Sequence, residues 1–234
     1  MFKSLLRKGK SIALRAGYSP ISRVFDPRRS AVPVKLQRSI QSGIMKMSYR
    51  GSGFFKSPFD VSLYLKLVQE LQPKLIIEIG SAEGGSAKWF ADLVKAINLD
   101  CEVHSFDITP PALDVSSPLF FHSGDIHQLE DTCLGELLES NSGPVLVSED
   151  GPHTYEGCLA ALSYFASRLR SGDYIVIEDG NLRDLGFWDL KNGPNRAIKH
   201  FLRNNQGIYE EDRELTGFFG PNVTWNTNGW LRKA

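Results

Sequence analysis

Short apolar runs of strand type alternate along this chain with segments that have the pattern of amphipathic helices. Strands that are separated by helices need crossover connections, which place the strands parallel in one sheet. The tail differs, because the extended segments 208–214 and 222–231 flank a stretch with glycine and proline and predict a hairpin. We predict an α/β fold: a Rossmann-like, mostly parallel sheet with helices on both faces and a C-terminal antiparallel hairpin. The expected parallel strands are residues 74–79, 102–106, 119–122, 144–147 and 174–177.

The first 58 residues do not share this alternation. Residues 1–30 carry eight Lys and Arg side chains and one acid, Asp26, although the whole chain has 27 basic and 27 acidic residues. Residues 18–58 are interrupted by prolines and glycines, so we predict irregular structure there. We expect a basic N-terminal segment and a lead-in or lid in residues 1–58, followed by the main domain in residues 59–234.

Three interpretations of the basic N-terminus remain open: a solvent-exposed terminal helix, docking on an anionic membrane surface, and a targeting peptide. The zero net charge of the whole chain gives no indication of nucleic-acid binding. The three cysteines have neither a paired framework nor a metal-ligand spacing, which favours a reducing cytosol. No apolar run approaches the roughly 20 residues that span a bilayer. We expect a cytoplasmic protein, located at the inner face of a membrane if the basic segment docks there.

Carboxylates follow two of the predicted strands and precede glycine in both places. Asp150 comes after the strand at 144–147, and the pair Glu178 and Asp179 comes directly after the strand at 174–177. The carboxyl ends of neighbouring parallel strands open onto one crevice, where ligands bind. Three acidic side chains that meet there repel one another unless a cation lies between them. The sequence therefore predicts a divalent metal site at this edge of the sheet.

A glycine-rich turn, residues 80–86 (GSAEGGS), follows the first predicted strand and opens onto the same edge. Gly80 allows a tight turn, and Gly84 lets a ligand approach the backbone closely. Ser86 and the free N–H groups of the first helical turn can hold polar or anionic atoms. The turn has neither the GxGxxG spacing of a dinucleotide site nor the lysine of a P-loop. A purely structural strand–helix turn is the alternative.

Three acids lie at successive strand ends around this turn: Glu78, Asp107 and Asp125. An acid in the position of Asp107 can accept from both hydroxyls of a ribose. Glu78 could accept from the ammonium of a ligand or order the turn, and Asp125 could reach the edge of an adenine. Each of them alone could equally be a cap or a solvated loop residue. Together they favour a nucleotide-type cofactor.

These motifs resemble those of a known group of enzymes. Residues 77–86 (IEIGSAEGGS) and 105–107 (SFD) resemble the cofactor site of class I S-adenosylmethionine-dependent methyltransferases. Later motifs are similar to those of the cephalosporin hydroxylase family, which includes rhamnosyl O-methyltransferases, and of metal-dependent macrolide-sugar O-methyltransferases. These motifs are Asp150-Gly151-x-His153, Ile177-Glu178-Asp179 and residues 226–231 (NTNGWL). The resemblance covers residues 59–234, which are therefore the expected methyltransferase domain.

The resemblance implies S-adenosylmethionine and Mg²⁺ as cofactors. It implies His153 as the general base, and Asp150, Glu178 and Asp179 as the metal ligands. The expected cofactor-binding residues are Glu78, Gly80, Ser81, Gly84, Ser86, Asp107 and Asp125. The sequence departs from the family pattern in two places. Glu149 precedes Asp150, and Glu83 lies inside the glycine turn, where it could disturb or tune the binding of the cofactor's carboxylate.

The expected function is metal-dependent transfer of a methyl group from S-adenosylmethionine to a hydroxyl. The expected acceptor is a sugar of a glycan, a glycolipid or a glycosylated natural product. Residues 181–193 mix aromatic and charged side chains and predict a mobile loop over the acceptor. The alternatives are a phenolic or catechol-type acceptor, a nicotinamide-dependent oxidoreductase, and a non-catalytic cofactor-binding scaffold in glycan assembly. Peripheral membrane contact through the N-terminus and a homo-oligomer are further expectations.

Overall fold

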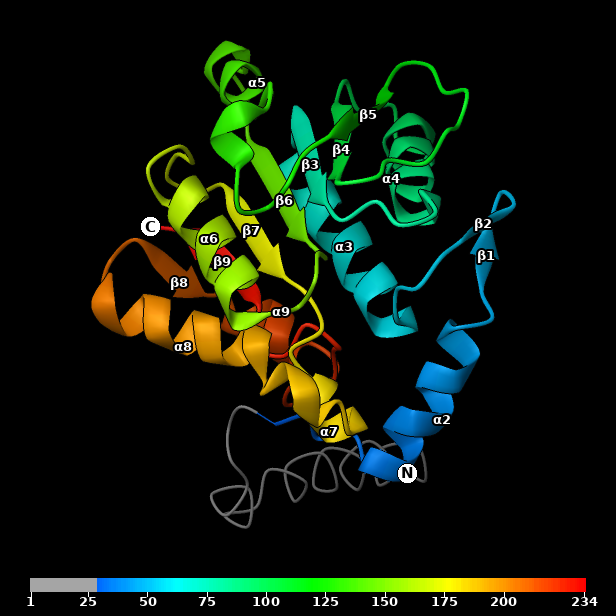
Figure 1. Cartoon of the computed structure of the whole chain (residues 1–234), viewed down its shortest axis with the longest axis vertical. Coiled ribbons are helices and arrows are strands. Elements are labelled where there is room, and N and C mark those ends of the chain that lie inside the picture. Colours follow the sequence, from blue (N-terminus) through cyan, green and yellow to red (C-terminus); the bar gives the residue numbers. More distant parts are fainter. Residues whose placement is uncertain (1–28) are drawn as a thin grey trace, which may run out of the picture.

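The structure is a computed structural model that describes residues 29–234. A seven-stranded sheet with the order β5-β4-β3-β6-β7-β9-β8 forms its centre (Figure 1). The five strands from β5 to β7 in that order are parallel, and β9 runs antiparallel to both β7 and β8. The strands are β3 (Leu75–Ile79), β4 (Glu102–Asp107), β5 (Leu119–Ser123), β6 (Val145–Glu149), β7 (Tyr174–Ile177), β8 (Tyr209–Glu211) and β9 (Trp230–Lys233).

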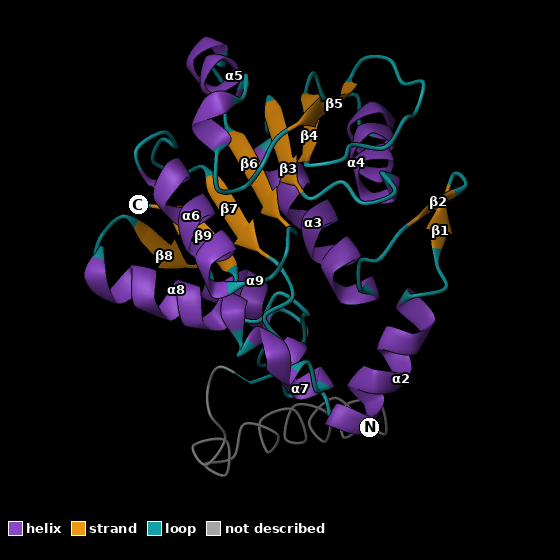
Figure 2. Cartoon of the chain, in the orientation of Figure 1, coloured by secondary structure: helices purple, strands orange, loops and turns teal. Residues whose placement is uncertain are grey.

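Helices cover both faces of this sheet, as Figure 2 shows. Successive residues of a strand point to opposite faces. Ile77 therefore packs in one apolar cluster, with α5, α6 and α8, whereas Ile76 packs in the other, with α3 and α4. The expected α/β architecture, a mostly parallel sheet between two layers of helices, is confirmed. The helices of these layers are α3 (Pro58–Leu71), α4 (Gly85–Ala96), α5 (Leu134–Ser140), α6 (Tyr155–Ala166) and α8 (Gly193–Asn204), and a 3₁₀ turn, η2 (Leu129–Asp131), precedes α5.

The antiparallel C-terminal pair is also confirmed, but its connection is longer than a hairpin turn. The helix α9 (Arg213–Gly217) follows β8, and residues 222–229 form buried irregular structure before β9 begins at Trp230. We expected that stretch to be extended. Its Asn and Thr side chains instead hydrogen-bond locally; for example, Asn228 N donates to Asn222 Oδ1 at 3.0 Å. Such local bonds compete with the ladder bonds of a strand.

Residues 29–58 contain regular elements that we did not expect. The helix α2 (Val34–Ile44) and the strands β1 (Ser48–Tyr49) and β2 (Ser52–Gly53) precede α3. Pro33 lies at the N-cap of α2, where proline does not interrupt a helix. The basic segment and its three interpretations lie in residues 1–28, outside the described residues.

The expected mobile loop after β7 contains two short helical elements. They are α7 (Leu182–Leu185) and the 3₁₀ turn η3 (Trp188–Leu190). The helix α2 packs against α7, and Asn181 Nδ2 donates to Gln37 Oε1 at 3.0 Å. The N-terminal part of the described chain thus lies against the segment that follows the acidic pair. Among the described residues, no helix has the length and apolar composition needed to cross a membrane.

Candidate active site

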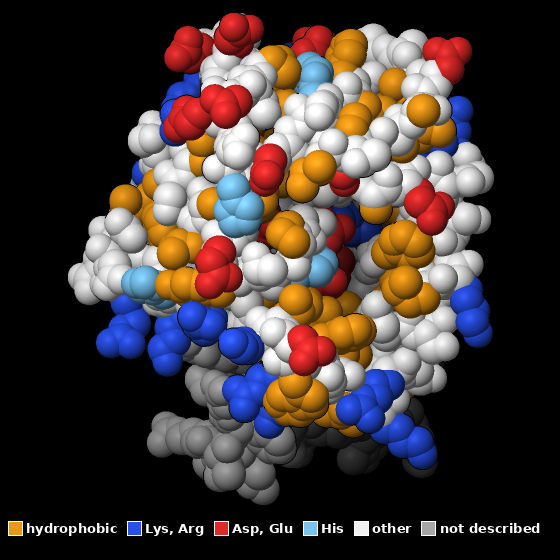
Figure 3. Space-filling view, viewed as in Figure 1, with side chains coloured by type: hydrophobic (Ala, Val, Ile, Leu, Met, Phe, Trp, Pro, Cys, Tyr) orange, Lys and Arg blue, Asp and Glu red, His pale blue; other side chains and the backbone are white. Residues whose placement is uncertain are grey.

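The carboxyl ends of β3, β4, β6 and β7 meet at one edge of the sheet. In the strand register, Ile79 of β3 lies beside Phe106 of β4 and Glu149 of β6, and Glu149 lies beside Ile177 of β7. The residues that follow these strand ends therefore converge. Figure 3 shows a hollow in this face of the molecule, with acidic, basic and histidine side chains inside it.

The glycine turn brings β3 close to β6. Gly80 has φ +98°, and a Cβ atom there would lie 2.2 Å from the carbonyl oxygen of Asp150. Gly84 has φ +78° and caps α4, and a Cβ on Gly85 would lie 2.0 Å from the carbonyl oxygen of Gly53. All three positions therefore require glycine for packing or backbone geometry. The glycines are therefore needed for the packing of the strand–helix turn, and this structural role does not exclude a role of the same turn in ligand binding.

A cleft of about 450 Å³ lies beside this turn. It brings together three of the predicted cofactor residues, Gly80, Asp107 and Asp125, and the predicted metal ligand Asp150. Its apolar walls include Ile79, Phe106 and Ile126. A concave space with apolar walls and a few polar groups is typical of a small-molecule site.

Asp107 orders the turn as well as lining the cleft. Its Oδ2 accepts hydrogen bonds from the backbone N–H groups of Ser81 at 2.9 Å and Ala82 at 3.1 Å. The Ser81 hydroxyl is turned to the Ser105 hydroxyl, 2.7 Å away. Four of the predicted cofactor residues, Glu78, Ser81, Gly84 and Ser86, do not line the cleft, so their roles stay predictions.

Glu78 lies under the turn and is fully buried. Its Oε2 accepts from the Ser105 hydroxyl at 2.6 Å, whereas its Oε1 has no hydrogen-bond partner. Burial raises the pKa of Glu78, and the charge of Lys56 opposes this shift. A buried carboxylate oxygen without a donor is costly unless a ligand satisfies it. Glu78 is therefore suited to accept from a cationic group of a ligand.

Two carboxylates and one imidazole form a compact group next to this cleft. His153 Nε2 lies 3.7 Å from Asp150 Oδ1 and 3.4 Å from Asp179 Oδ2. One ligand atom from each of the three residues lies within 4.8 Å of the others, which is close enough to surround one metal ion. His153 and Asp179 have φ +53° and +56°. Such backbone conformations are uncommon outside glycine and cluster at functional sites.

Glu178 does not join this group, although the sequence placed it there. Its Oε1 accepts from the Tyr64 hydroxyl at 2.7 Å, from the Ser148 hydroxyl, and from Lys56 Nζ at 2.6 Å. The same ammonium donates to Asp150 Oδ2 at 2.8 Å. The role of Glu178 as a metal ligand stays a prediction.

The close charges shift the pKa values of these groups. Burial lowers the pKa of His153, but the carboxylates of Asp179 and Asp150 outweigh it and raise the pKa above its usual value. Burial raises the pKa of Asp179 to about 6, although His153 opposes the shift. Burial also lowers the pKa of Lys56, but Asp150 and Glu178 raise it well above the usual value, so Lys56 is charged at neutral pH.

The sequence did not single out Lys56 or Tyr64. Lys56 lies in a stretch that was predicted to be irregular. Tyr64 lies in the apolar helix α3, where the sequence favours a place in the hydrophobic core for an aromatic residue. Only the tertiary structure brings them to Glu178.

The sheet has the strand order of class I methyltransferases, in which one antiparallel strand, here β9, lies between the parallel strands and the edge strand. The glycine turn after β3 is also a feature of this class. Residues 42–234 match the family "Rhamnosyl O-methyltransferase/CmcI", and the chain belongs to this family.

Several curated relatives and solved structures are similar to the chain. A rhamnosyl O-methyltransferase of Mycobacterium leprae (strain TN) is 32% identical over 191 residues, which are 79% of this chain and 82% of the relative. A rhamnosyl O-methyltransferase of Mycobacterium tuberculosis (strain H37Rv) is 30% identical over 197 residues, covering 80% and 78%. The structure described as "cmcI-D160 Mg-SAM" superposes with a TM-score of 0.61 at 22% identity, covering 81% of this chain and 77% of that one. This last similarity is one of fold.

Proposed function

We propose that the protein is a metal-dependent O-methyltransferase that moves a methyl group from S-adenosylmethionine to a sugar hydroxyl. The observation that carries the proposal is the group of Asp150, His153 and Asp179 beside the cleft of the glycine turn. The names of the curated relatives support a sugar acceptor, and the name of the CmcI structure supports Mg²⁺ and S-adenosylmethionine.

S-adenosylmethionine fits the residues around the cleft. The free oxygen of Glu78 suits the amino group of the methionine part, and Asp107 and Asp125 line the cleft where ribose hydroxyls and an adenine edge would lie. The apolar walls suit the adenine ring. Because Asp107 already accepts from the turn, it would hold the ribose and the turn together.

Mg²⁺ fits the oxygen atoms of Asp150 and Asp179, because this ion prefers carboxylates and keeps open positions for water or substrate. When bound, the metal would supply a Lewis acid that makes a hydroxyl more acidic. Oxygen ligands suit Mg²⁺ better than an imidazole does. We therefore assign His153 to proton transfer rather than to coordination.

His153 would accept the proton of the acceptor hydroxyl on Nε2. The two neighbouring carboxylates, 3.7 and 3.4 Å from Nε2, would stabilise the imidazolium that forms. The acceptor oxygen forms a bond to the methyl carbon, the carbon–sulfur bond breaks, and its electron pair stays on sulfur. The products are the methyl ether and S-adenosylhomocysteine. Holding oxygen, carbon and sulfur in line provides much of the rate.

The first test is calorimetric titration with S-adenosylhomocysteine, with Mg²⁺ and again with EDTA. We expect micromolar binding, followed by methylation of sugar acceptors in Mg²⁺ buffer, detected as a mass gain of the acceptor. Asp179→Ala should abolish turnover while circular dichroism shows an intact fold. Unchanged methylation by this variant would refute the metal-dependent reaction. Cofactor binding with no metal affinity would instead favour the scaffold, and methylation of catechols alone would favour a phenolic acceptor.

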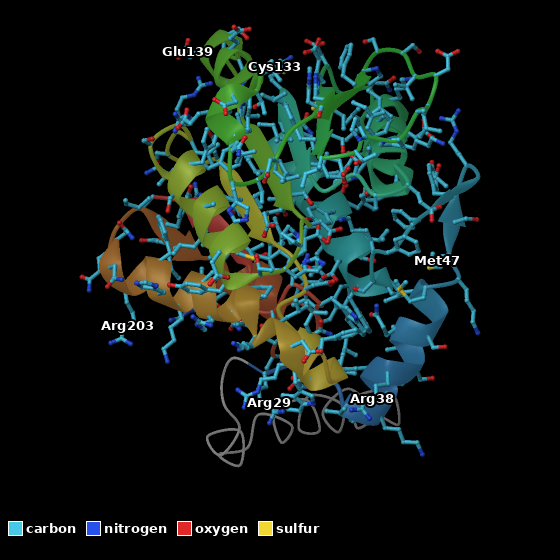
Figure 4. All side chains as sticks on the ribbon, in the orientation of Figure 1. Arg29, Arg38, Met47, Cys133, Glu139 and Arg203 are labelled. Carbon is cyan, nitrogen blue, oxygen red and sulfur yellow. The ribbon has the colours of Figure 1, made fainter. Side chains whose placement is uncertain are left out.

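We also propose that the protein contacts an anionic membrane through a basic face. This face contains the helices α2 and α8, neither of which has an Asp or Glu, and the 3₁₀ turn η3, which has the exposed Trp188 and one exposed acid, Asp189. Basic side chains gather along this edge in Figure 3, and Arg29, Arg38 and Arg203 are labelled along it in Figure 4. Basic residues next to an exposed aromatic side chain are typical of binding to anionic lipid headgroups.

Flotation with vesicles tests this contact. We expect binding to vesicles that contain phosphatidylglycerol and not to pure phosphatidylcholine. The double variant Lys199→Glu/Arg203→Glu should lose most of the binding, since each basic residue near the surface contributes about 1 kcal/mol. Lys95→Glu on α4 is the control. Equal binding to neutral vesicles, or wild-type binding by the double variant, would contradict the proposal. The contribution of residues 1–28, the cytoplasmic location and the homo-oligomer stay predictions.

A further inference from the structure

A lysine ammonium lies inside the carboxylate site. The Lys56 side chain is 1% exposed, and its Nζ contacts Asp150 Oδ2 and Glu178 Oε1 at 2.8 and 2.6 Å. Lysine is rarely buried without a specific pairing, because removing the charge from water is costly. Here two carboxylates of the predicted metal site provide that pairing.

The contacts divide the two oxygens of Asp150 between two partners. Oδ2 accepts from Lys56, whereas Oδ1 faces His153. Glu178 lies on the lysine side, where Tyr64 and Ser148 also hold its Oε1. Asp179 lies on the histidine side. The site therefore has a half whose carboxylates already contact an ammonium and a half that is available to a metal ion.

Hydrogen bonds hold the backbone on both sides of Lys56, and they position its ammonium at the site. Gly53 N donates to Glu83 Oε2 of the glycine turn at 2.8 Å. Ser57 is the N-cap of α3, and its hydroxyl accepts from Asp60 N at 3.1 Å. Lys56 is thus held between the cofactor turn and the first turn of a long helix.

We propose that Lys56 is a positioning residue that sets the metal affinity of this site. Its ammonium engages Glu178 and one oxygen of Asp150, so a divalent ion is left with the other oxygen of Asp150 and with Asp179. The inference rests on the proposed metal-dependent function. A positive charge so close to the ion repels it, and an engaged carboxylate contributes less to its binding. A neutral side chain at this position should therefore tighten metal binding.

This expectation separates the proposal from a purely structural role. A lysine that only neutralises Asp150 and Glu178 would stabilise the fold, and its removal would loosen the site and weaken metal binding. A lysine that shares the carboxylates with the metal has the opposite effect on affinity. The direction of the change in metal affinity therefore decides between them.

The experiment measures Mn²⁺ binding to the full chain by electron paramagnetic resonance of the free ion, without cofactor or acceptor. The variants are Lys56→Met, which removes the charge, and Lys56→Gln, which keeps a hydrogen-bond donor. Lys95→Met, at an exposed lysine of α4, is the matched control. We expect both Lys56 variants to bind Mn²⁺ about tenfold more tightly or better, and the control to bind as the wild type does.

Thermal unfolding in EDTA and in Mn²⁺ accompanies the titration. A Lys56 variant that is folded only with Mn²⁺ also supports the proposal, because the metal then replaces the missing ammonium. Unchanged or weaker Mn²⁺ binding by a folded variant would overturn it. If the wild type and both variants all fail to bind Mn²⁺, the proposed metal dependence itself is wrong, and this outcome differs from a failure that is confined to Lys56.

Discussion

Replacing Gly80 by alanine tests whether the cofactor turn and the metal site share one rigid backbone contact. The new Cβ would lie 2.2 Å from the carbonyl oxygen of Asp150, far inside the ordinary contact distance. The φ of +98° is also unfavourable for alanine. Backbone strain of this kind costs about 1–3 kcal/mol, and overpacking adds about 1–3 kcal/mol. We expect the free energy of unfolding to fall by about 2–6 kcal/mol.

The assay is urea denaturation followed by circular dichroism, together with S-adenosylhomocysteine titration of the folded variant. Because relief of the contact would move Asp150, both cofactor and Mn²⁺ affinity should fall. Gly43→Ala is the matched control, since Gly43 lies in α2 and a Cβ there meets nothing within 4 Å. It should stabilise the protein by about 0.5–1 kcal/mol. A Gly80→Ala variant within 1 kcal/mol of the wild type, with unchanged ligand affinities, would refute the reasoning.

Three further changes probe the centre itself. Tyr64→Phe keeps the buried ring but removes the hydroxyl donor to Glu178, and should cost about 1–3 kcal/mol in urea denaturation; no loss would show that the bond is unimportant. His153→Ala should lower the methylation rate by about 10²–10⁴ while S-adenosylhomocysteine affinity stays within a few-fold; wild-type rates across pH would exclude it as the base. The raised pKa values of His153 and Asp179 mean that the folded state holds these protons more tightly than the unfolded state does. Their contribution to stability is therefore lost as pH rises through these folded-state values, and thermal unfolding in EDTA should show lower stability at pH 8 than at pH 5. Added Mg²⁺ should reduce this loss, and a metal-free protein that gains stability over the same range would contradict the assignment.

The parallel part of the fold was predictable because its signals are local. β3, β6 and β7 are covered on both faces, and each contains at least three consecutive apolar residues, although β3 also contains Glu78 and β6 ends in Ser148 and Glu149. The acids that follow them are also local in sequence, and the strand register alone brings Asp150 and Asp179 to the same edge. The antiparallel β9 was harder to delimit, because the Asn- and Thr-rich residues 222–229 are buried through side-chain hydrogen bonds rather than through apolar contact.

The remaining features depend on contacts between distant segments. The helix α2 was missed because Pro33 was interpreted as an interruption, although it lies at the helix start. Asn181 is bound by Gln37, which is 144 residues earlier in the chain, and no periodic pattern indicates such a pair. Lys56 gives even less signal, since one lysine in a polar stretch ordinarily lies in solvent. Its burial follows from how the chain between β2 and α3 is fixed.

Glu83 holds the chain segment between β2 and α3 in place. From the sequence, this acid inside the glycine turn could disturb or tune the binding of a cofactor carboxylate, and that effect stays a prediction. In the structure its Oε2 accepts the backbone N–H of Gly53, and Gly85 leaves room for the Gly53 carbonyl. The carboxylate therefore holds β2 against the start of α4, and Lys56 follows three residues later. The residue that departs from the family pattern in the turn thus anchors the segment that delivers an ammonium to Asp150 and Glu178.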